Sequence, residues 1–231
     1  MQENRLTPRL AWFADRVRRG AQFVDVGTDH AKLPVWLVKN GKVKKAVAAD
    51  IGEGPIARAQ MYIRASGCTN KIETVITDGL RGISVLPPCD VAICGMGGET
   101  IRGILDSAPE IRDRQVRLLL QPMTDFALLR RYLAENGFVP EEEDIVASEG
   151  RLYQCMVVSF SGVPYVLSEA EAELGKTAIQ KHSEPFLQYV KRRYTIVEKC
   201  LQGKQKADLD TAVEVSLLAS YAEILEAYSL K

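Results

Sequence analysis

Short apolar runs alternate with longer amphipathic stretches over the first half of the chain. Apolar residues of the opening segment, 6–19, recur at helical spacing, which predicts a helix. The runs that follow are short, apolar on both faces, and far enough apart for a helix between each pair. Strands of a parallel sheet that is covered on both sides have this pattern. The sequence therefore predicts an α/β fold whose mostly parallel sheet contains strands at 23–26, 46–50, 73–76, 91–94 and 117–120.

The pattern changes after a predicted helix at about 125–136, which Asn136 and Gly137 end. Two further strands are predicted at 144–147 and 152–160, and a short turn rich in polar residues separates them. This closeness favours an antiparallel hairpin. A mostly parallel sheet closed by an antiparallel hairpin is an architecture found among nucleotide-binding folds.

No strand pattern follows the boundary at 162–168. Apolar residues keep helical spacing over 186–201 and again over 209–225, on either side of Gly203. Two amphipathic helices joined near Gly203 would pair as an antiparallel, coiled-coil-like hairpin, because neither buries its apolar face alone. We therefore expect two domains, a sheet domain over 1–163 and a helical extension over 164–231.

Composition narrows the class of protein. Of the 231 residues, 46% are hydrophobic and 26% charged, which excludes a disordered or low-complexity chain. No apolar run approaches the ~18 residues of a transmembrane helix, and the N-terminus lacks the apolar core of a secretory signal. The five cysteines form no CxxC pair and there are only two histidines, so we expect reduced thiols and no metal site. These features predict a soluble, cytoplasmic protein without a membrane partner.

Charge is balanced overall but segregated along the chain. Thirty basic and thirty acidic residues give a formal net charge of zero, which by itself argues against a nucleic-acid partner. Basic residues nevertheless dominate 1–20 and 181–206, whereas 135–150 is strongly acidic. The local field can steer an anionic partner, so the basic segments are candidate RNA-binding surfaces. The alternative is that each run is only a solvated helix face.

The strongest local signal is the turn that follows the first predicted strand. Asp25 lies near the end of that strand, and Gly27 begins a turn that enters a helix, as in nucleotide-binding βαβ units. Where a dinucleotide fingerprint has its second glycine, this chain has Asp29. A carboxylate there would repel an anionic pyrophosphate but not the cationic sulfonium of S-adenosylmethionine. The pattern favours a methyltransferase over a dehydrogenase, although Asp29 could instead be the N-cap of the helix.

Two further strand ends carry acidic residues. Asp50 follows Gly27 at the distance from which an acid can accept hydrogen bonds from both ribose hydroxyls of an adenosine. Asp78 can accept from an adenine amino group, with Gly79 leaving room for the ring. The alternatives are that Asp50 caps the next helix and that Asp78 and Gly79 only form a turn.

The ends of the fourth and fifth strands complete the predicted edge. Three glycines among residues 95–98 permit close backbone approach to a ligand, although Met96 could be simple core packing. Gln121 and Pro122 end the fifth strand and could contact a target base, although Pro122 could serve only to stop the strand.

The runs DVGTDHAKLP, AAD, TDGL, ICGMGG and LLLQP, together with the helical C-terminal segment, resemble the bacterial tRNA (adenine-22-N1)-methyltransferase family over essentially the whole chain. The resemblance implies a class I, Rossmann-like methyltransferase domain with a coiled-coil-like helical pair. It also implies S-adenosylmethionine as the methyl donor and N1 of adenine 22, in the D-loop region of tRNA, as the target. Two departures are Asp50, where the family often has Glu, and Met123, where Asn is common.

The resemblance and the strand-end pattern together assign the site. We expect cofactor contacts at Asp25, Gly27, Asp50, Ile51, Asp78, Gly79, Gly95 and Met96. Asp29 falls on the position proposed to be catalytic, where it would accept from the N6 amino group and orient the adenine ring. Substrate contacts are expected at His30, Gln121 and Pro122 for the base and at Lys191, Arg192 and Arg193 for tRNA phosphates. We expect a monomer.

Three other functions stay open at this point. The chain could be a class I methyltransferase that acts on another RNA site or on a small molecule. It could also be a non-catalytic RNA-binding module on the same fold, although such a module has no need for a row of acidic residues at one sheet edge. A nicotinamide-dependent dehydrogenase is disfavoured by the missing glycines and by Asp29.

Overall fold

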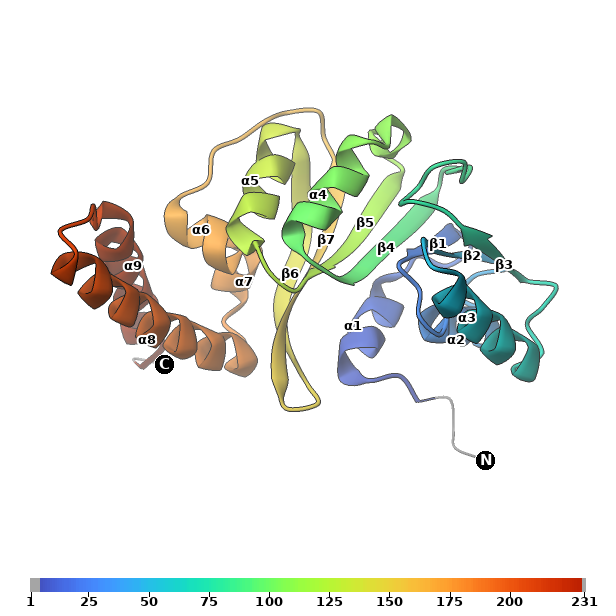
Figure 1. The fold of residues 1–231 in the computed structure, drawn as a ribbon, viewed down its shortest axis with the longest axis horizontal. Helices are drawn as coiled ribbons and strands as arrows, with labels where there is room; N and C mark the ends of the chain where they lie inside the picture. The colour runs from blue at the N-terminus through green and yellow to red at the C-terminus, as the bar shows by residue number, and fades with distance from the viewer. Residues whose placement is uncertain (1–4, 230–231) are drawn as a thin grey trace.

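The computed structural model describes residues 5–229, which form a seven-stranded sheet with helices on both faces and a helical pair beside it (Figure 1). The sheet order is β3-β2-β1-β4-β5-β7-β6, in which the first five strands in the chain run parallel and β6 and β7 form an antiparallel hairpin. The strands are β1 (Gln22–Val26), β2 (Ala46–Asp50), β3 (Ile72–Ile76), β4 (Cys89–Met96), β5 (Val116–Pro122), β6 (Phe138–Ser148) and β7 (Arg151–Phe160). The predicted fold class is confirmed.

Alternate residues of the central strands enter two separate cores. On one face Val24 of β1 packs in the cluster that contains α4 (Gly98–Asp106) and α5 (Phe126–Glu135). On the other face Phe23 packs with α1 (Pro8–Arg16), α2 (Lys32–Lys39) and α3 (Glu53–Ala65). Because both faces are covered, the strands contain apolar residues without polar alternation.

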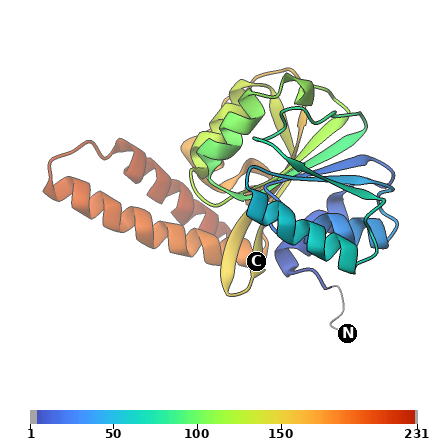
Figure 2. The ribbon, with the colours of Figure 1, turned by 45° about the vertical axis from the view of Figure 1, so that its right-hand side comes forward.

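The helical pair consists of α8 (Glu184–Lys206) and α9 (Ala212–Ser229), which project from the sheet domain as a hairpin (Figure 2). Phe186, Val190 and Val197 of α8 pack with Tyr221 of α9 in one apolar cluster. The expected pairing of the two helices is confirmed, whereas a regular coiled coil is not shown. The predicted joint at Gly203 is wrong: α8 continues through Gly203, and the chain turns at Asp208, which has a positive φ of 53°.

Two short helices, α6 (Glu169–Leu174) and α7 (Lys176–Lys181), connect the sheet domain to this pair and were not predicted. Each has six residues, too few for an apolar period to be recognised. Their presence means that the chain between the sheet and the helical pair is ordered and packed. The boundary at 163 stays a prediction.

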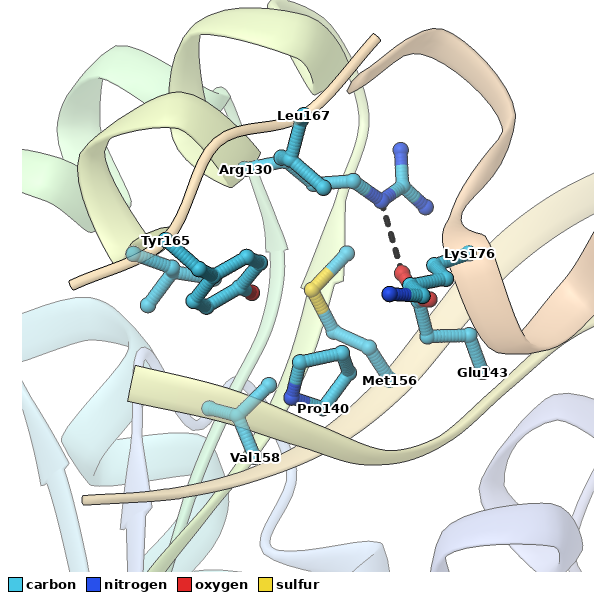
Figure 3. Close-up of a pocket in the computed structure, with 9 residues that line it drawn as sticks. Arg130, Pro140, Glu143, Met156, Val158, Tyr165, Leu167 and Lys176 are labelled. Atoms are coloured by element: carbon cyan, nitrogen blue, oxygen red, sulfur yellow. Dashed lines mark hydrogen bonds and ion pairs between the residues drawn. The ribbon is translucent and has the colours of Figure 1, made fainter. Parts of the chain in front are cut away.

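A buried ion pair holds this connection against the sheet (Figure 3). Arg130 of α5 and Glu143 of β6 are both almost fully buried, and Arg130 Nε donates to Glu143 Oε1 at 2.7 Å. Arg130 also donates to the backbone carbonyls of Ala172 and Glu173, and Glu143 Oε2 accepts from the N–H and hydroxyl of Thr177. The small apolar cavity beside the pair, about 10 Å³, has no room for a ligand. The pair therefore joins α5, β6, α6 and α7.

The acidic stretch at 135–150 is not a solvated helix face. Most of it forms β6, which begins at Phe138 rather than at the predicted residue 144. Glu142 binds Arg16 at 2.5 Å and Lys181 at 2.9 Å, and these partners lower the pKa of its carboxyl to about 2. Arg16 of α1 and Lys181 of α7 are thus paired with Glu142. Both predicted basic surfaces therefore contain fewer cations that are free to bind an anionic partner.

None of the helices within residues 5–229 is both long enough and apolar enough to cross a membrane.

Candidate active site

A crevice opens at the carboxyl ends of β1 and β4. These strands are neighbours, but α2 follows β1 on one face of the sheet and α4 follows β4 on the other. Ligands of open α/β sheets bind at such a switch point. Two cavities of about 410 and about 390 Å³ lie here, and Gly27 lines both of them.

Gly27 is required at this junction. Its φ is +77°, and a Cβ on it would collide with the terminal methyl of Met96. Its N–H donates to the carbonyl of Ala49 at 2.8 Å, which ties the turn to β2. The absent side chain makes room for Met96 against the Gly27 backbone, and this turn lines both cavities.

The first cavity brings together Asp50, Ile51, Asp78 and Gly79, four of the predicted cofactor residues. Asp50 Oδ1 accepts from the N–H of Gly52 at 2.8 Å, but the N-cap residue of α3 is Gly52 itself, so the carboxylate is not the helix cap. Ile51 is 71% exposed beside it, which suits a flat apolar ring rather than core packing. Gly79 has a φ of +64° and lies against Ile104. This cavity is therefore the candidate site for the nucleoside part of the cofactor.

The second cavity contains Asp25, Asp29, His30 and Gly95. Burial raises the pKa of Asp25 to about 6, and the negative charge of Asp50 acts in the same direction. The hydroxyl of Thr28 and the cation of Arg9 oppose this shift. Asp25 is thus a carboxylate in the floor of the crevice that a cationic ligand would stabilise.

Asp29 lies at the rim of the second cavity with its side chain 59% exposed. Its Oδ1 accepts from Arg58 Nε at 2.8 Å and Nη2 at 2.5 Å, and its Oδ2 lies 3.1 Å from His30 Nε2. The hydrogen bonds from Arg58 lower the pKa of Asp29, which stays ionised. The N-cap alternative is wrong, since α2 has Ala31 at its N-cap and Thr28 Oγ1 accepts from the Ala31 N–H.

Gln121 and Pro122 end β5 as predicted, but both are buried. Gln121 Oε1 accepts from Arg9 Nη1, and its amide nitrogen donates to the Pro122 carbonyl at 2.8 Å. The structure therefore assigns Gln121 to holding Arg9. Contact of either residue with a base stays a prediction, and their burial does not favour it.

The three predicted phosphate contacts on α8 differ from one another. Lys191 and Arg192 are exposed. The prediction for Arg193 is corrected by the structure. Its side chain is half-buried, and its Nη2 binds Glu173 Oε2 of α6 at 2.9 Å. Arg193 therefore joins α8 to α6 and is not a free cation on the surface.

Three residues near the crevice were missed from the sequence. Arg9 of α1 and Glu149 of the β6–β7 turn line the second cavity, and Arg58 of α3 binds Asp29. No local motif marks them, because helix packing and the long hairpin bring them there. Arg9 and Glu149 had one signal, membership of the charge-rich segments 1–20 and 135–150, whereas Arg58 of α3 had none.

No group of three or more His, Cys, Asp or Glu side chains that could hold a metal ion occurs among residues 5–229.

Comparison with known proteins agrees with this geometry. A family model for the methyltransferase domain matches residues 6–156. The tRNA (adenine(22)-N(1))-methyltransferase of Bacillus subtilis is 32% identical over 68% of this chain, and the match spans 66% of that protein, just under two thirds.

Two solved structures are similar over almost the whole length. The B. subtilis M1A22 tRNA methyltransferase TrmK superposes with a TM-score of 0.75 at 25% identity, covering 99% of each chain. Streptococcus pneumoniae Sp1610, solved with S-adenosyl-L-methionine, gives a TM-score of 0.83 at 30% identity and covers 96% of this chain and 100% of that one.

Proposed function

The chain belongs to the methyltransferase-domain family, and within it to the tRNA (adenine(22)-N(1))-methyltransferase family, and we propose that it methylates N1 of adenine 22 in tRNA with S-adenosylmethionine as the methyl donor. The observation that carries the proposal is the crevice in which Asp25, Asp50 and Asp78 line two cavities that meet at Gly27. Negative side chains suit a cationic donor and oppose an anionic dinucleotide. Arg9 and Arg81 also line these cavities, so the methyltransferase-domain match over residues 6–156, rather than charge alone, argues against the dehydrogenase alternative.

The residues of the first cavity fit the nucleoside part of the cofactor. Asp50 and Asp78 both line this cavity, and we propose that Asp50 accepts hydrogen bonds from ribose hydroxyls and Asp78 from an adenine amino group. Ile51 offers an exposed apolar surface to the ring, and Gly79 lines the cavity at a position where a Cβ would crowd Ile104. When bound, S-adenosylmethionine supplies an electrophilic methyl group on a positively charged sulfonium.

The protein has no nucleophile to create, because adenine N1 carries its own lone pair. Its task is to hold the ring in line at about 3–3.5 Å and to exclude water. N1 lies on the pairing edge of the base, so the nucleotide must leave its stack to enter the crevice. Asp29 lies at the rim and is kept ionised by Arg58, and we propose that it accepts from the N6 amino group and stabilises the positive charge that develops on the ring.

The direct experiment is to incubate the protein with labelled S-adenosylmethionine and an unmodified tRNA transcript, digest the RNA and identify the labelled nucleoside. We expect N1-methyladenosine. A label on another base or on the exocyclic nitrogen would assign a different RNA target, and transfer to no RNA would leave a small-molecule methyltransferase or a non-catalytic RNA-binding module.

Cofactor affinity should depend on the ionisation of Asp25. Its pKa of about 6 means that lowering the pH from 7 to 5 protonates most of this carboxylate and removes its attraction for a cationic ligand. Calorimetry should therefore show about tenfold weaker binding of S-adenosylmethionine at pH 5 than at pH 7. The Asp25→Asn variant should bind weakly and equally at both pH values, whereas a pH dependence that persisted in it would exclude Asp25 as the titrating group.

The exposed bases of α8 should contact tRNA phosphates. Reversing Lys191 and Arg192 to Glu should raise the KM for tRNA about tenfold or more and flatten its salt dependence, because fewer counterions are released. Reversal of Lys44 and Lys45, which are exposed directly before β2, is the matched control. Equal effects of the two double variants would show that only overall charge matters.

The oligomeric state, the cellular location and the metal requirement are also part of the proposal. We propose that the protein acts as a monomer in the cytoplasm and needs no metal ion. Sedimentation of the protein alone and with tRNA tests the first of these.

A further inference from the structure

Arg58 and Asp29 come from different parts of the fold and meet at the rim of the second cavity. Asp29 lies in the turn between β1 and α2, whereas Arg58 lies in α3, the helix that follows β2. The helices α2 and α3 cover the same face of the sheet and contact each other. The ion pair therefore connects the turn that carries Asp29 to a neighbouring helix.

Arg58 directs two N–H groups at one oxygen of Asp29. Its Nε donates to Oδ1 at 2.8 Å, and its Nη2 donates to the same oxygen at 2.5 Å. A carboxylate oxygen has two lone-pair sites, so these two hydrogen bonds occupy both sites of Oδ1. An N–H group of a ligand that approaches Asp29 must therefore donate to the other oxygen, Oδ2.

Oδ2 keeps capacity to accept. Within residues 5–229, His30 is the one side chain that the structure brings to this oxygen, with Nε2 at 3.1 Å. A ring N–H at that nitrogen uses one lone-pair site of Oδ2 and leaves the second. The carboxylate of Asp29 thus presents one defined acceptor site to the cavity that it borders.

Asp29 depends on a partner for its direction rather than for its charge at neutral pH. Its side chain is 59% exposed and lies in a turn, where an aspartate has several rotamers available. The ordinary pKa of aspartate is about 4, so the carboxylate is ionised at pH 7 even without the hydrogen bonds from Arg58. The fork of two N–H groups is what fixes the position of both oxygens.

Arg58 is itself held along its own helix. Gly54 lies one turn earlier in α3, and a Cβ on it would lie 3.6 Å from Arg58 Nη1, so the guanidinium lies close to this bare backbone. The Arg58 side chain is 49% exposed. An ion pair that is exposed to this extent adds little to the stability of the fold, so Arg58 can be replaced without unfolding the protein.

We propose that Arg58 is a positioning residue for the methyl transfer, which holds the Asp29 carboxylate so that Oδ2 is the oxygen that accepts from the N6 amino group of the target adenine. This inference rests on the proposed function, in which Asp29 contacts the base. A tRNA phosphate is the competing partner of the guanidinium, but it would have to displace Asp29 from both Nε and Nη2.

The test is a double-mutant cycle on turnover with tRNA at saturating S-adenosylmethionine. Arg58→Met should lower kcat about 10-fold, because a misplaced group loses part of its effect on the transition state. The KM for tRNA and the affinity for S-adenosylhomocysteine should stay within about threefold of wild type, since neither depends on the direction of Asp29. Arg58→Lys should recover part of kcat. In the Asp29→Ala background, Arg58→Met should have no further effect on kcat.

Two controls separate this role from a general one. Arg64→Met removes an exposed arginine from the same helix and should match wild type in kcat and KM. The melting temperature of Arg58→Met should stay within about 2 °C of wild type, as expected for an exposed pair.

Each other outcome has a definite meaning. An unchanged kcat in Arg58→Met, beside a reduced kcat in Asp29→Ala, would overturn the positioning role and leave the proposed function standing. A raised KM for tRNA with an unchanged kcat would assign Arg58 to RNA. An equal loss of kcat in the presence and absence of the Asp29 carboxylate would show that Arg58 acts independently of it. Absence of methyl transfer to tRNA in the wild-type protein would refute the proposed function and this inference together.

Discussion

Replacing Asp29 by alanine should reduce turnover on tRNA at least about 100-fold while cofactor affinity stays within about threefold of wild type. Cofactor affinity should change little because Asp29 lies at the rim of the second cavity, away from the nucleoside residues. Turnover should fall because Arg58 keeps the Asp29 carboxylate ionised, so the substitution removes a charge. Loss of a charged group that orients the base and stabilises a developing cation has effects of this size. The measurement is kcat at saturating tRNA beside calorimetry with S-adenosylhomocysteine.

Two further variants test whether the loss of turnover is due to the carboxylate of Asp29. Asp29→Asn keeps the shape and removes the charge, so turnover in it separates orientation from charge stabilisation. Glu110→Ala removes an exposed acid on the short helical turn after α4 and should leave both quantities unchanged. Turnover of Asp29→Ala within threefold of wild type would remove Asp29 from the mechanism.

Arg130→Met should lower the free energy of unfolding by about 3–5 kcal/mol, because it leaves the Glu143 carboxylate buried without its cation. For a chain of this length the melting temperature should fall by roughly 6–20 °C. Thermal and urea unfolding measure this directly. Because the pair joins α5 to α6 and α7, the helical connection should also exchange amide hydrogens faster.

The control is an exposed pair of similar chemistry. Arg102 binds Glu99 at 2.6 Å with both side chains about half exposed, so Arg102→Met should cost less than about 1 kcal/mol. The double variant Arg130→Met/Glu143→Met should be less destabilised than the two single variants together, since it leaves no unpaired charge. A cost below about 1 kcal/mol for Arg130→Met would show that the pair does not hold the connection.

The sheet was predictable because its strands are apolar on both faces. β1 through β5 lie within a few residues of the predicted segments. The first half of β6 was missed because its acidic residues look like a solvated surface, and only the fold supplies Arg16, Arg130 and Lys181 as their partners. Long-range pairing of this kind leaves no local pattern.

The residues of the candidate site likewise fall into a group that the sequence could predict and a group that it could not. Asp25, Gly27, Asp50 and Asp78 lie at or just after the carboxyl ends of their strands, which parallel pairing brings to one edge, so the sequence could place them together. Arg9 and Arg58 come from the faces of helices, and their direction is set by tertiary packing. For the same reason Arg193, which looks like its exposed neighbours, could not be recognised as a partner of Glu173.

Methyl transfer to adenine 22 can be measured as the rate of methyl incorporation into two tRNA transcripts that differ only at position 22. With adenine at position 22 we expect stoichiometric incorporation, and with guanine there we expect none above background. Equal incorporation into both transcripts, or into neither, would contradict it.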